Sequence, residues 1–236
     1  MITVIIPARL QSQRLPGKPL LNVNGKPLLW YAWRSAAEWV GEENVHVATP
    51  NAPIFSRCFA LGISCGLTGD EHPNGTSRVL EAAAELGSDS YSSEDVLVNL
   101  QADEPEITPA MLGAAYELLT DHPSLVVSTL SRDLTDGEIG DRNVVKVIRW
   151  GWKAAYFSRA RLGGAEAHLG LYMFRCSHVD ALRGAPQNIQ GKEEGLEQLR
   201  WMGYGLPIGI ARVDGQPCGV NTLREYREFA ERATRN

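Results

Sequence analysis

The sequence is poor in the features that mark several large protein classes. Its cysteines, Cys58, Cys65, Cys176 and Cys218, are scattered without a Cys-x-x-Cys or Cys/His spacing, which indicates reduced structural thiols rather than a zinc site or a disulfide framework. No apolar run approaches the roughly 20 residues of a membrane-spanning helix, and the N-terminus leads into a strand pattern rather than a signal peptide. We therefore expect a cytoplasmic protein without a membrane partner.

Two common phosphate-binding signatures are also missing. The sequence contains neither Gly-x-x-x-x-Gly-Lys-Ser/Thr nor a Gly-x-Gly-x-x-Gly after a strand, so neither a P-loop nor a dinucleotide-binding site is indicated. The formal net charge of −5 disfavours a general nucleic-acid surface but leaves room for a local basic pocket. With 236 residues, 44% of them hydrophobic, the chain can bury a substantial core and suits one domain over residues 1–236.

The most informative stretch lies at the N-terminus. Residues 2–6 are apolar and mostly β-branched, which predicts a buried strand of a parallel sheet. The loop that follows carries Arg9, Arg14 and Lys18 among small or rigid residues, and it opens where such sheets bind ligands. It can hold backbone amides and cations around a multiply charged anion such as a nucleoside triphosphate. A solvated loop of surface charges is the alternative.

An acidic turn follows a second buried strand. Residues 95–101 are largely apolar and are followed by a polar turn over residues 102–105, so this strand brings Asp103 to the same edge of the sheet. Asp103 is either an ordinary turn residue or a ligand of Mg²⁺, which prefers one or two carboxylates together with phosphate oxygens and water.

Hydrophobic periodicity predicts the other elements. Helices are expected over residues 27–40, 53–61, 79–86, 109–119, 192–200 and 223–233, and strands over residues 44–49, 63–67, 125–130, 141–148, 153–160 and 207–213. Their alternation predicts an α/β fold with parallel pairing and right-handed crossovers. Thr76 and Thr222 are the expected N-caps. Arg78, near the start of a helix, opposes the helix dipole and is either an exposed side chain or a contact for an anion.

These stretches resemble the 3-deoxy-manno-octulosonate cytidylyltransferases, also called CMP-KDO synthetases. The resemblance rests on residues 4–9, 14–20, 25–27, 72–78, 101–105, 141–147, 154–160, 168–172, 192–200 and 219–222. It implies a three-layer Rossmann-like nucleotidyltransferase fold with a mixed, mostly parallel sheet. In this fold residues about 1–110 would bind the nucleotide and residues about 111–236 the acceptor.

The resemblance also implies an activity: Mg²⁺-dependent transfer of CMP from CTP to a sugar acid, KDO or a relative, with release of pyrophosphate, as in lipopolysaccharide synthesis. The implied catalytic residues are Arg14, Lys18 and Asp103. The implied nucleotide contacts are Ala8, Arg9, Ser12, Arg14, Lys18, Arg78 and Gln101. The implied acceptor contacts are His168, Tyr172, Glu197 and Gln198, and the implied metal ligands are Asp103 and Asn221. The implied partners are CTP, the sugar acid and a second copy of the chain in a homodimer.

Several positions depart from the family pattern. Asn221 stands where the family has the second Asp ligand of magnesium, Ala102 replaces Gly on what we expect to be the acceptor side, and the excursion before His168 is nearly absent. Asp214 is a candidate to replace the missing carboxylate. These departures leave open a different sugar or sugar phosphate as acceptor, and a nucleotide-binding paralogue without catalysis. His168 is alternatively a core or capping residue, and the 192–200 helix a solvated one.

Overall fold

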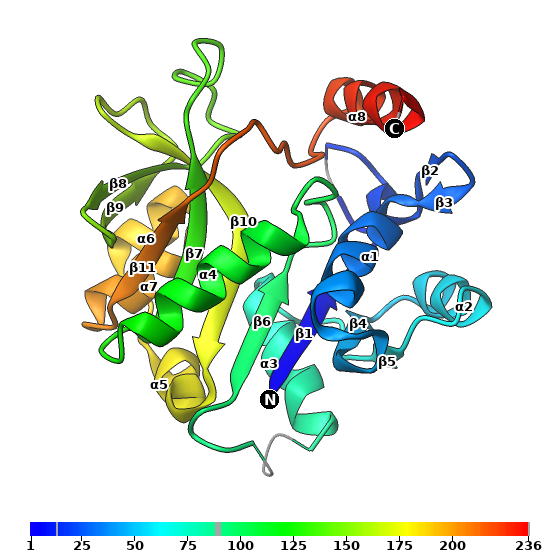
Figure 1. Ribbon diagram of the computed structural model, residues 1–236, viewed down its shortest axis with the longest axis horizontal. Coiled ribbons are helices and arrows are strands. Elements are labelled where there is room, and N and C mark those ends of the chain that lie inside the picture. Colours follow the sequence, from blue (N-terminus) through cyan, green and yellow to red (C-terminus); the bar gives the residue numbers. More distant parts are fainter. Residues whose placement is uncertain (13, 88–90, 236) are drawn as a thin grey trace.

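A mixed sheet forms the centre of the protein. The computed structural model describes residues 1–12, 14–87 and 91–235, so Gln13 of the N-terminal loop lies outside the described residues. Within them, nine strands pair in the order β5-β4-β1-β6-β10-β7-β11-β9-β8 (Figure 1). All of these run in one direction except β9 and β10, which confirms the expected mixed, mostly parallel sheet.

The strands are β1 (Ile2–Pro7), β4 (Val45–Thr49), β5 (Cys65–Leu67), β6 (Val96–Leu100), β7 (Val127–Arg132), β8 (Lys146–Trp150), β9 (Lys153–Ser158), β10 (Glu166–Arg175) and β11 (Ile208–Arg212), with a separate hairpin of β2 (Asn22–Val23) and β3 (Lys26–Pro27). The α-helices are α1 (Leu28–Val40), α2 (Ala52–Ala60), α3 (Gly75–Glu85), α4 (Pro109–Asp121), α5 (Val179–Gly184), α6 (Ile189–Glu194), α7 (Glu197–Gly203) and α8 (Leu223–Arg235). Within the described residues, no helix combines the length and apolar character needed to cross a membrane.

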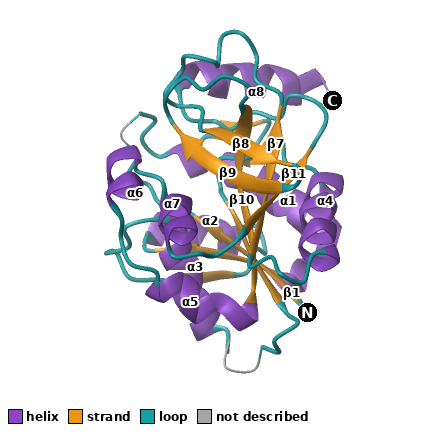
Figure 2. Ribbon diagram, turned by 90° about the vertical axis from the view of Figure 1, so that its left-hand side faces the viewer, coloured by secondary structure: helices purple, strands orange, loops and turns teal. Residues whose placement is uncertain are grey.

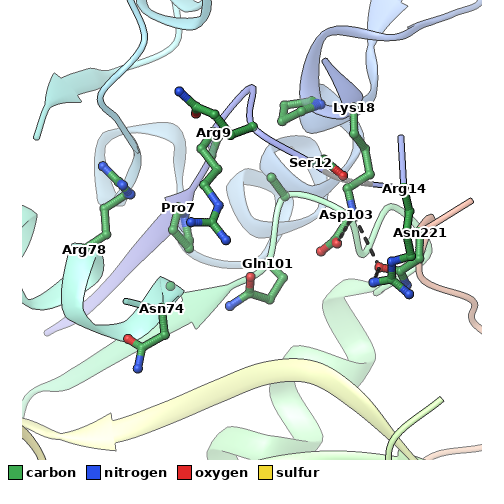
Figure 3. A pocket seen from close by; sticks show the side chains of 15 residues that line it. Pro7, Arg9, Ser12, Arg14, Lys18, Asn74, Arg78, Gln101, Asp103 and Asn221 are labelled. Atoms are coloured by element: carbon green, nitrogen blue, oxygen red, sulfur yellow. Dashed lines mark hydrogen bonds and ion pairs between the residues drawn. The ribbon is translucent and has the colours of Figure 1, made fainter. Parts of the chain in front are cut away.

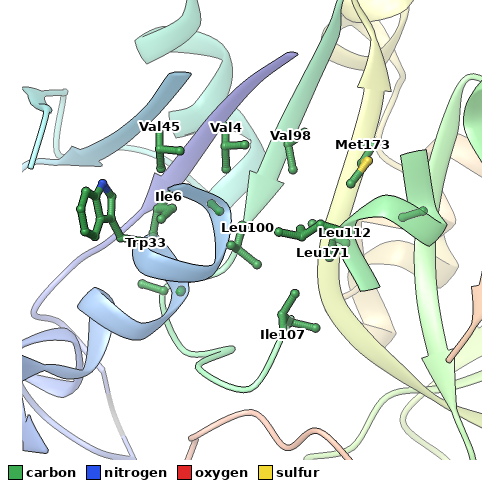
Figure 4. Close-up of a cluster of buried hydrophobic side chains, with 14 of the residues drawn as sticks. Val4, Ile6, Trp33, Val45, Val98, Leu100, Ile107, Leu112, Leu171 and Met173 are labelled. Carbon is green, nitrogen blue, oxygen red and sulfur yellow. The ribbon is translucent and has the colours of Figure 1, made fainter. Parts of the chain in front are cut away.

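Helices cover both faces of the sheet and give three layers. Helices α1 and α4 lie on one face, and α3, α5, α6 and α7 lie on the other (Figures 1 and 2). Alternate residues of β1 enter separate cores, because successive side chains of a strand point to opposite faces. Val4 and Ile6 pack in the cluster that includes residues of α1 and α4 (Figure 4), whereas Ile5 packs in the cluster that includes residues of α3 and α7. The apolar run at residues 2–6 is therefore buried on both faces.

Several local expectations differ from the structure, and the strand expected over residues 141–148 begins only at Lys146. Strand β10, which lies between β6 and β7, was not expected, because polar and small residues interrupt its apolar pattern. The helix expected over residues 192–200 is two helices, because Gly195 adopts a left-handed conformation with φ of 62° at the end of α6. Thr76 is not the N-cap of α3. That position belongs to Asn74, which accepts a hydrogen bond from the Ser77 amide at 2.8 Å.

Candidate functional site

The N-terminal loop leaves β1 beside the end of β6. These two strands pair in parallel, with Ile5 opposite Asn99, so their carboxyl ends open at the same edge of the sheet. Gly17 turns the loop with φ of 68°, a conformation that favours glycine. Leu15, only 8% exposed, anchors the loop in an apolar cluster with Val220 and with Phe229 of α8.

The amides of this loop are largely occupied. The Ala8 amide donates to the Ala48 carbonyl at 2.9 Å, and the Leu10 amide donates to Asn51 Oδ1 at 2.8 Å. The Gly17 amide donates to the Leu10 carbonyl at 3.1 Å. These three amides are therefore not available to an anion, and the expectation that backbone amides surround an anion is wrong for them. The loop also offers a ligand its side-chain cations, on a backbone that these hydrogen bonds partly fix.

A cavity of about 740 Å³ opens against this loop (Figure 3). All seven residues expected to contact a nucleotide line it, together with residues from the starts of α3 and α8 and from the turn after β6. The lining residues are Pro7, Ala8, Arg9, Gln11, Ser12, Arg14, Lys18, Pro19, Asn74, Gly75, Arg78, Gln101, Ala102, Asp103 and Asn221. The sequence separation of these residues shows that the fold assembles one cationic cavity from four distant segments.

One ammonium group joins the acidic turn to the C-terminal segment. Lys18 Nζ forms an ion pair with Asp103 Oδ2 and lies 3.4 Å from Asn221 Oδ1. Asn221 Oδ1 also accepts a hydrogen bond from Arg14 at 3.2 Å. Two oxygens from residues 103 and 221 thus converge on a single cation (Figure 3).

The backbone fixes this convergence. The Val220 amide donates to the Asp103 carbonyl at 2.7 Å. Thr222 caps α8, as expected, by accepting from the Glu225 amide at 3.3 Å. The Glu225 carboxylate in turn accepts from the Asn221 and Thr222 amides at 2.7 and 2.8 Å. This reciprocal capping box holds residue 221 in place. Asp214, in contrast, is exposed and lines neither this cavity nor the adjoining cavity described below, so it does not replace the missing carboxylate.

Arg78 is buried rather than exposed on a helix surface. Its side chain is 3% exposed, and it donates to Thr68 Oγ1 and, at 2.9 Å, to the Gly69 carbonyl. Burial, reinforced by the nearby Arg9, lowers the pKa of Arg78. Both of these hydrogen-bond acceptors are neutral, so the guanidinium keeps its attraction for an anion in the cavity that it lines.

A second cavity of about 310 Å³ adjoins the first and shares Arg14, Asn74, Gly75, Gln101, Asp103 and Asn221 with it. The four residues expected to contact an acceptor all line this second cavity: His168, Tyr172, Glu197 and Gln198. Ala102 lines only the first cavity, so the expectation that it lies on the acceptor side is wrong.

His168 is a neutral hydrogen-bonding group. The Thr129 hydroxyl donates its proton to the Leu171 carbonyl, so it accepts from His168 Nε2, which lies 2.9 Å away. Nδ1 of the ring is then left as an acceptor. Burial, with a smaller effect of Arg159, lowers the pKa of His168 to about 3. The imidazole therefore stays uncharged at neutral pH and can accept a hydrogen bond from a hydroxyl group.

The other acceptor-side residues are polar groups inside a mostly buried wall. Glu197 Oε1 accepts from the Thr76 hydroxyl at 2.8 Å, while its Oε2 is buried without a partner in the described part of the chain. Burial raises the pKa of Glu197 to about 7 and raises that of Tyr172 well above its usual range. Gln198 is 2% exposed. These groups can pair with the hydroxyls of a sugar.

Several further residues that line this cavity were not among the predicted site residues. Glu104 Oε1 accepts from the Gly170 amide at 2.8 Å, and burial, with the charge of Asp103, raises its pKa to about 8. Arg132, 4% exposed, pairs with Glu138. Asn143 accepts a hydrogen bond from Arg14. The available sequence signals were the adjacency of Glu104 to Asp103 and the place of Asn143 in the 141–147 stretch, whereas the contact of Asn143 with Arg14 joins residues far apart in the chain.

Replacing His168 with Gln tests its environment. Because the folded pKa of about 3 lies below the usual value of about 6.5, the unfolded chain binds an extra proton between these values and the folded wild type loses stability as the pH falls. We expect the wild type to lose stability relative to His168→Gln by at most about 1.4 kcal/mol per pH unit. Urea denaturation of both proteins at pH 7, 5.5 and 4 measures this. A constant difference would contradict the assignment.

Comparison with known proteins agrees with this geometry. The cytidylyltransferase family model matches residues 3–201. A protein of Paramagnetospirillum magneticum (strain ATCC 700264 / AMB-1) named 3-deoxy-manno-octulosonate cytidylyltransferase is 36% identical over 231 residues, covering 93% of this chain and 92% of the relative. The protein of that name from Halorhodospira halophila (strain DSM 244 / SL1) is 36% identical over 250 residues, covering 98% and 96%.

Solved structures show the same likeness. A CMP:2-keto-3-deoxy-manno-octonic acid synthetase complexed with CTP superposes with a TM-score of 0.89 at 30% identity, covering 99% of this chain and 98% of the other. A cytidylyltransferase from Leptospira borgpetersenii serovar Hardjo-bovis (strain JB197) shares the fold, with a TM-score of 0.66 at 16% identity over 100% of this chain and 87% of the other. The chain belongs to the cytidylyltransferase family.

Proposed function

We propose that this cytidylyltransferase activates 3-deoxy-manno-octulosonate or a closely related sugar acid with CTP, releasing a CMP-sugar and pyrophosphate. The observation that carries the proposal is the junction of the two cavities, where Gln101, Asp103 and Asn221 face both. One cavity presents cations to a triphosphate, and the other presents hydrogen-bonding groups to a polar acceptor. The names of the relatives and the CTP-bound structure support this choice of substrates.

The reaction needs no covalent enzyme intermediate. An acceptor hydroxyl attacks the α-phosphorus of CTP, the new O–P bond forms, the bond to pyrophosphate breaks, and the hydroxyl loses its proton. Negative charge builds on the phosphate oxygens and on the leaving pyrophosphate. Arg14 and Lys18, fixed beforehand at the cavity wall, would bind the β- and γ-phosphates, while Arg9 and Arg78 add positive charge. Prearranged cations of this kind lower the barrier of phosphoryl transfer.

The donor set at the junction fits Mg²⁺. Asp103 Oδ2 and Asn221 Oδ1 are hard oxygen ligands, and both already contact the Lys18 ammonium. Within the described residues, no group of three or more His, Cys, Asp and Glu side chains is placed to hold a metal, so the phosphates and water would complete the shell of this ion. When bound, Mg²⁺ would offset negative charge on the phosphates. Lys18, which already lines the cavity, would then contact the phosphates from its present position, and the metal would lie beside Asp103.

The sugar acceptor is the substrate for which a second candidate exists. Only residues 160–167 separate Arg159 from His168, and these two flanking residues line the acceptor cavity. A different sugar acid or a sugar phosphate is therefore the second candidate, and a nucleotide-binding protein without turnover is the third. The homodimer and the cytoplasmic location stay predictions from the sequence.

A pyrophosphate-release assay tests the substrates. We expect CTP with KDO and Mg²⁺ to give pyrophosphate and a CMP-sugar, with ATP, GTP and UTP much less active. A panel of sugar acids and sugar phosphates serves as the comparison. Activity with another sugar but not with KDO would replace the acceptor. Mg²⁺-dependent CTP binding in calorimetry without turnover for any sugar would reject the catalytic proposal.

Substitutions of Lys18 and Asp103 test the roles assigned to residues of the nucleotide cavity. We expect Lys18→Ala to lower kcat by about 10²–10³-fold, on the order of 2 to 4 kcal/mol, because a prearranged charge on the leaving group is lost. Asp103→Asn should abolish turnover. Lys26→Ala is the matched control, because Lys26 lies over the Trp30 ring and outside both cavities. Wild-type rates in both variants would refute the assigned roles.

Asn221→Asp tests the metal site by adding a carboxylate. A second carboxylate strengthens the hold on Mg²⁺, so we expect the Mg²⁺ concentration for half-maximal activity to fall several-fold. Asn143→Asp is the matched control, because Asn143 also accepts from Arg14 but does not contact Lys18. Titration of pyrophosphate release with Mg²⁺ measures both. An equal shift in the two variants would show a general charge effect instead of ligation by residue 221.

A further inference from the structure

A line of hydrogen-bonded side chains crosses the core between the two cavities. Gln101 Nε2 donates to Asn99 Oδ1 at 3.1 Å, Asn99 Nδ2 donates to Thr76 Oγ1 at 3.0 Å, and the Thr76 hydroxyl donates to Glu197 Oε1 at 2.8 Å. We call these four residues the relay. It starts at the junction of the cavities and ends in the wall of the acceptor cavity.

The inner members of the relay are sealed from water. Asn99 is 0% exposed and Thr76 is 2% exposed. Asn99 lies on β6 directly opposite Tyr172 of β10, and Thr76 lies in the first turn of α3. A buried amide or hydroxyl that loses its partner cannot turn to solvent. The partners of these two side chains are therefore fixed by the protein alone.

The chemistry of the last member sets the direction of every bond. The Thr76 hydroxyl donates its single proton to Glu197 Oε1, and the ionised form of this carboxyl can only accept such a bond. The Thr76 oxygen is then an acceptor, and it requires the amide nitrogen of Asn99. The oxygen of Asn99 faces Gln101, which must donate from its own nitrogen. With the amide nitrogen turned toward Asn99, the Gln101 carbonyl oxygen Oε1 and the second N–H of Nε2 remain for the junction of the cavities.

We propose that Asn99 and Thr76 are positioning residues that hold the carbonyl oxygen of Gln101 toward the substrates and couple it to Glu197. The junction then offers an acceptor to a hydrogen-bond donor of the substrate, such as a sugar hydroxyl. The identity of that substrate rests on the proposed function. The hydrogen bonds of the relay themselves do not, because they exist without a ligand.

The coupling between Gln101 and Glu197 can be followed through the protonation of Glu197, which the groups around this carboxyl influence. Arg200, one turn further along α7, lowers the pKa of Glu197, and Glu197 in turn raises the pKa of Tyr172 on β10. Arg159, His168 and Glu104 line the same cavity. Burial raises the pKa of Glu197, and the Thr76 hydroxyl opposes that rise. A change of charge on Glu197 near neutral pH would therefore alter the strength of each hydrogen bond along the relay.

Nuclear magnetic resonance tests the relay without any substrate. In the wild type, we expect the side-chain amide resonances of Gln101 and Asn99 to titrate with the midpoint of the Glu197 carboxyl. In Thr76→Val, which keeps the shape but removes the hydroxyl, the Gln101 resonance should no longer follow Glu197. Thr76→Ser should restore the dependence. A Gln101 resonance that ignores Glu197 in the wild type, or still follows it in Thr76→Val, would overturn the proposal.

Kinetics give the second readout. We expect Thr76→Val to raise the KM for the sugar about tenfold through the loss of a buried hydrogen bond to a charged group, with a much smaller change in the KM for CTP, and Thr76→Ser to reverse this. Ser128→Ala is the control, because Ser128 is equally buried but donates to the Ala115 carbonyl away from both cavities. Equal effects of Thr76→Val and Ser128→Ala on the sugar KM would also overturn the proposal. Absence of turnover in the wild type would instead reject the proposed function.

Discussion

The site depends on the attraction between one ammonium group and two oxygens. Lys18 from the N-terminal loop, Asp103 from the turn after β6 and Asn221 from the segment before α8 meet at one point. Lys18 compensates the charge of the Asp103 carboxylate, and burial, together with the charge of that carboxylate, raises the pKa of the neighbouring Glu104. The same attraction makes the place suitable for a metal-bound nucleotide, because the protein already balances a positive charge there. Nucleotide binding would replace the ion pair between Lys18 and Asp103 with contacts of Lys18 to phosphate and of Asp103 to the metal.

The acceptor side works by the opposite principle. There burial disfavours the charged forms of ionisable side chains: it lowers the pKa of His168 and raises the pKa values of Tyr172, Glu197 and Glu104. The nucleotide side keeps its cations, Arg9 and Arg14 among them, exposed to the cavity. The highly charged nucleotide would thus contact a cationic wall, and the sugar acid, which carries fewer charges, would contact a wall with more hydrogen-bonding groups. The two walls touch at Gln101, and the transfer would take place there.

The sequence predicted the parts of this site that lie in continuous stretches. The strand at residues 2–6, the cationic loop and Asp103 are each read from a run of neighbouring residues, and the parallel pairing of β1 with β6 brings them together. It did not predict what depends on contacts between distant segments. Asn74 and Thr76 are both capable N-caps, and the contact of Thr76 with Asn99 and Glu197 decides between them. The helix break at Gly195 depends on the packing of α7 against the cavity, which the local sequence does not show.

The apolar cluster under the N-terminal loop has a consequence for biosynthesis. Leu15 packs with Val220 and with Phe229 of α8, and Asn221 lies between these two contacts in the chain. A ribosome makes this loop long before it makes the segment at Val220 and Phe229 that supports it. The nascent chain can pair β1 with β4 and β6 early, yet its nucleotide site stays incomplete until α8 has been made. Partly synthesised chains should therefore not sequester nucleotide.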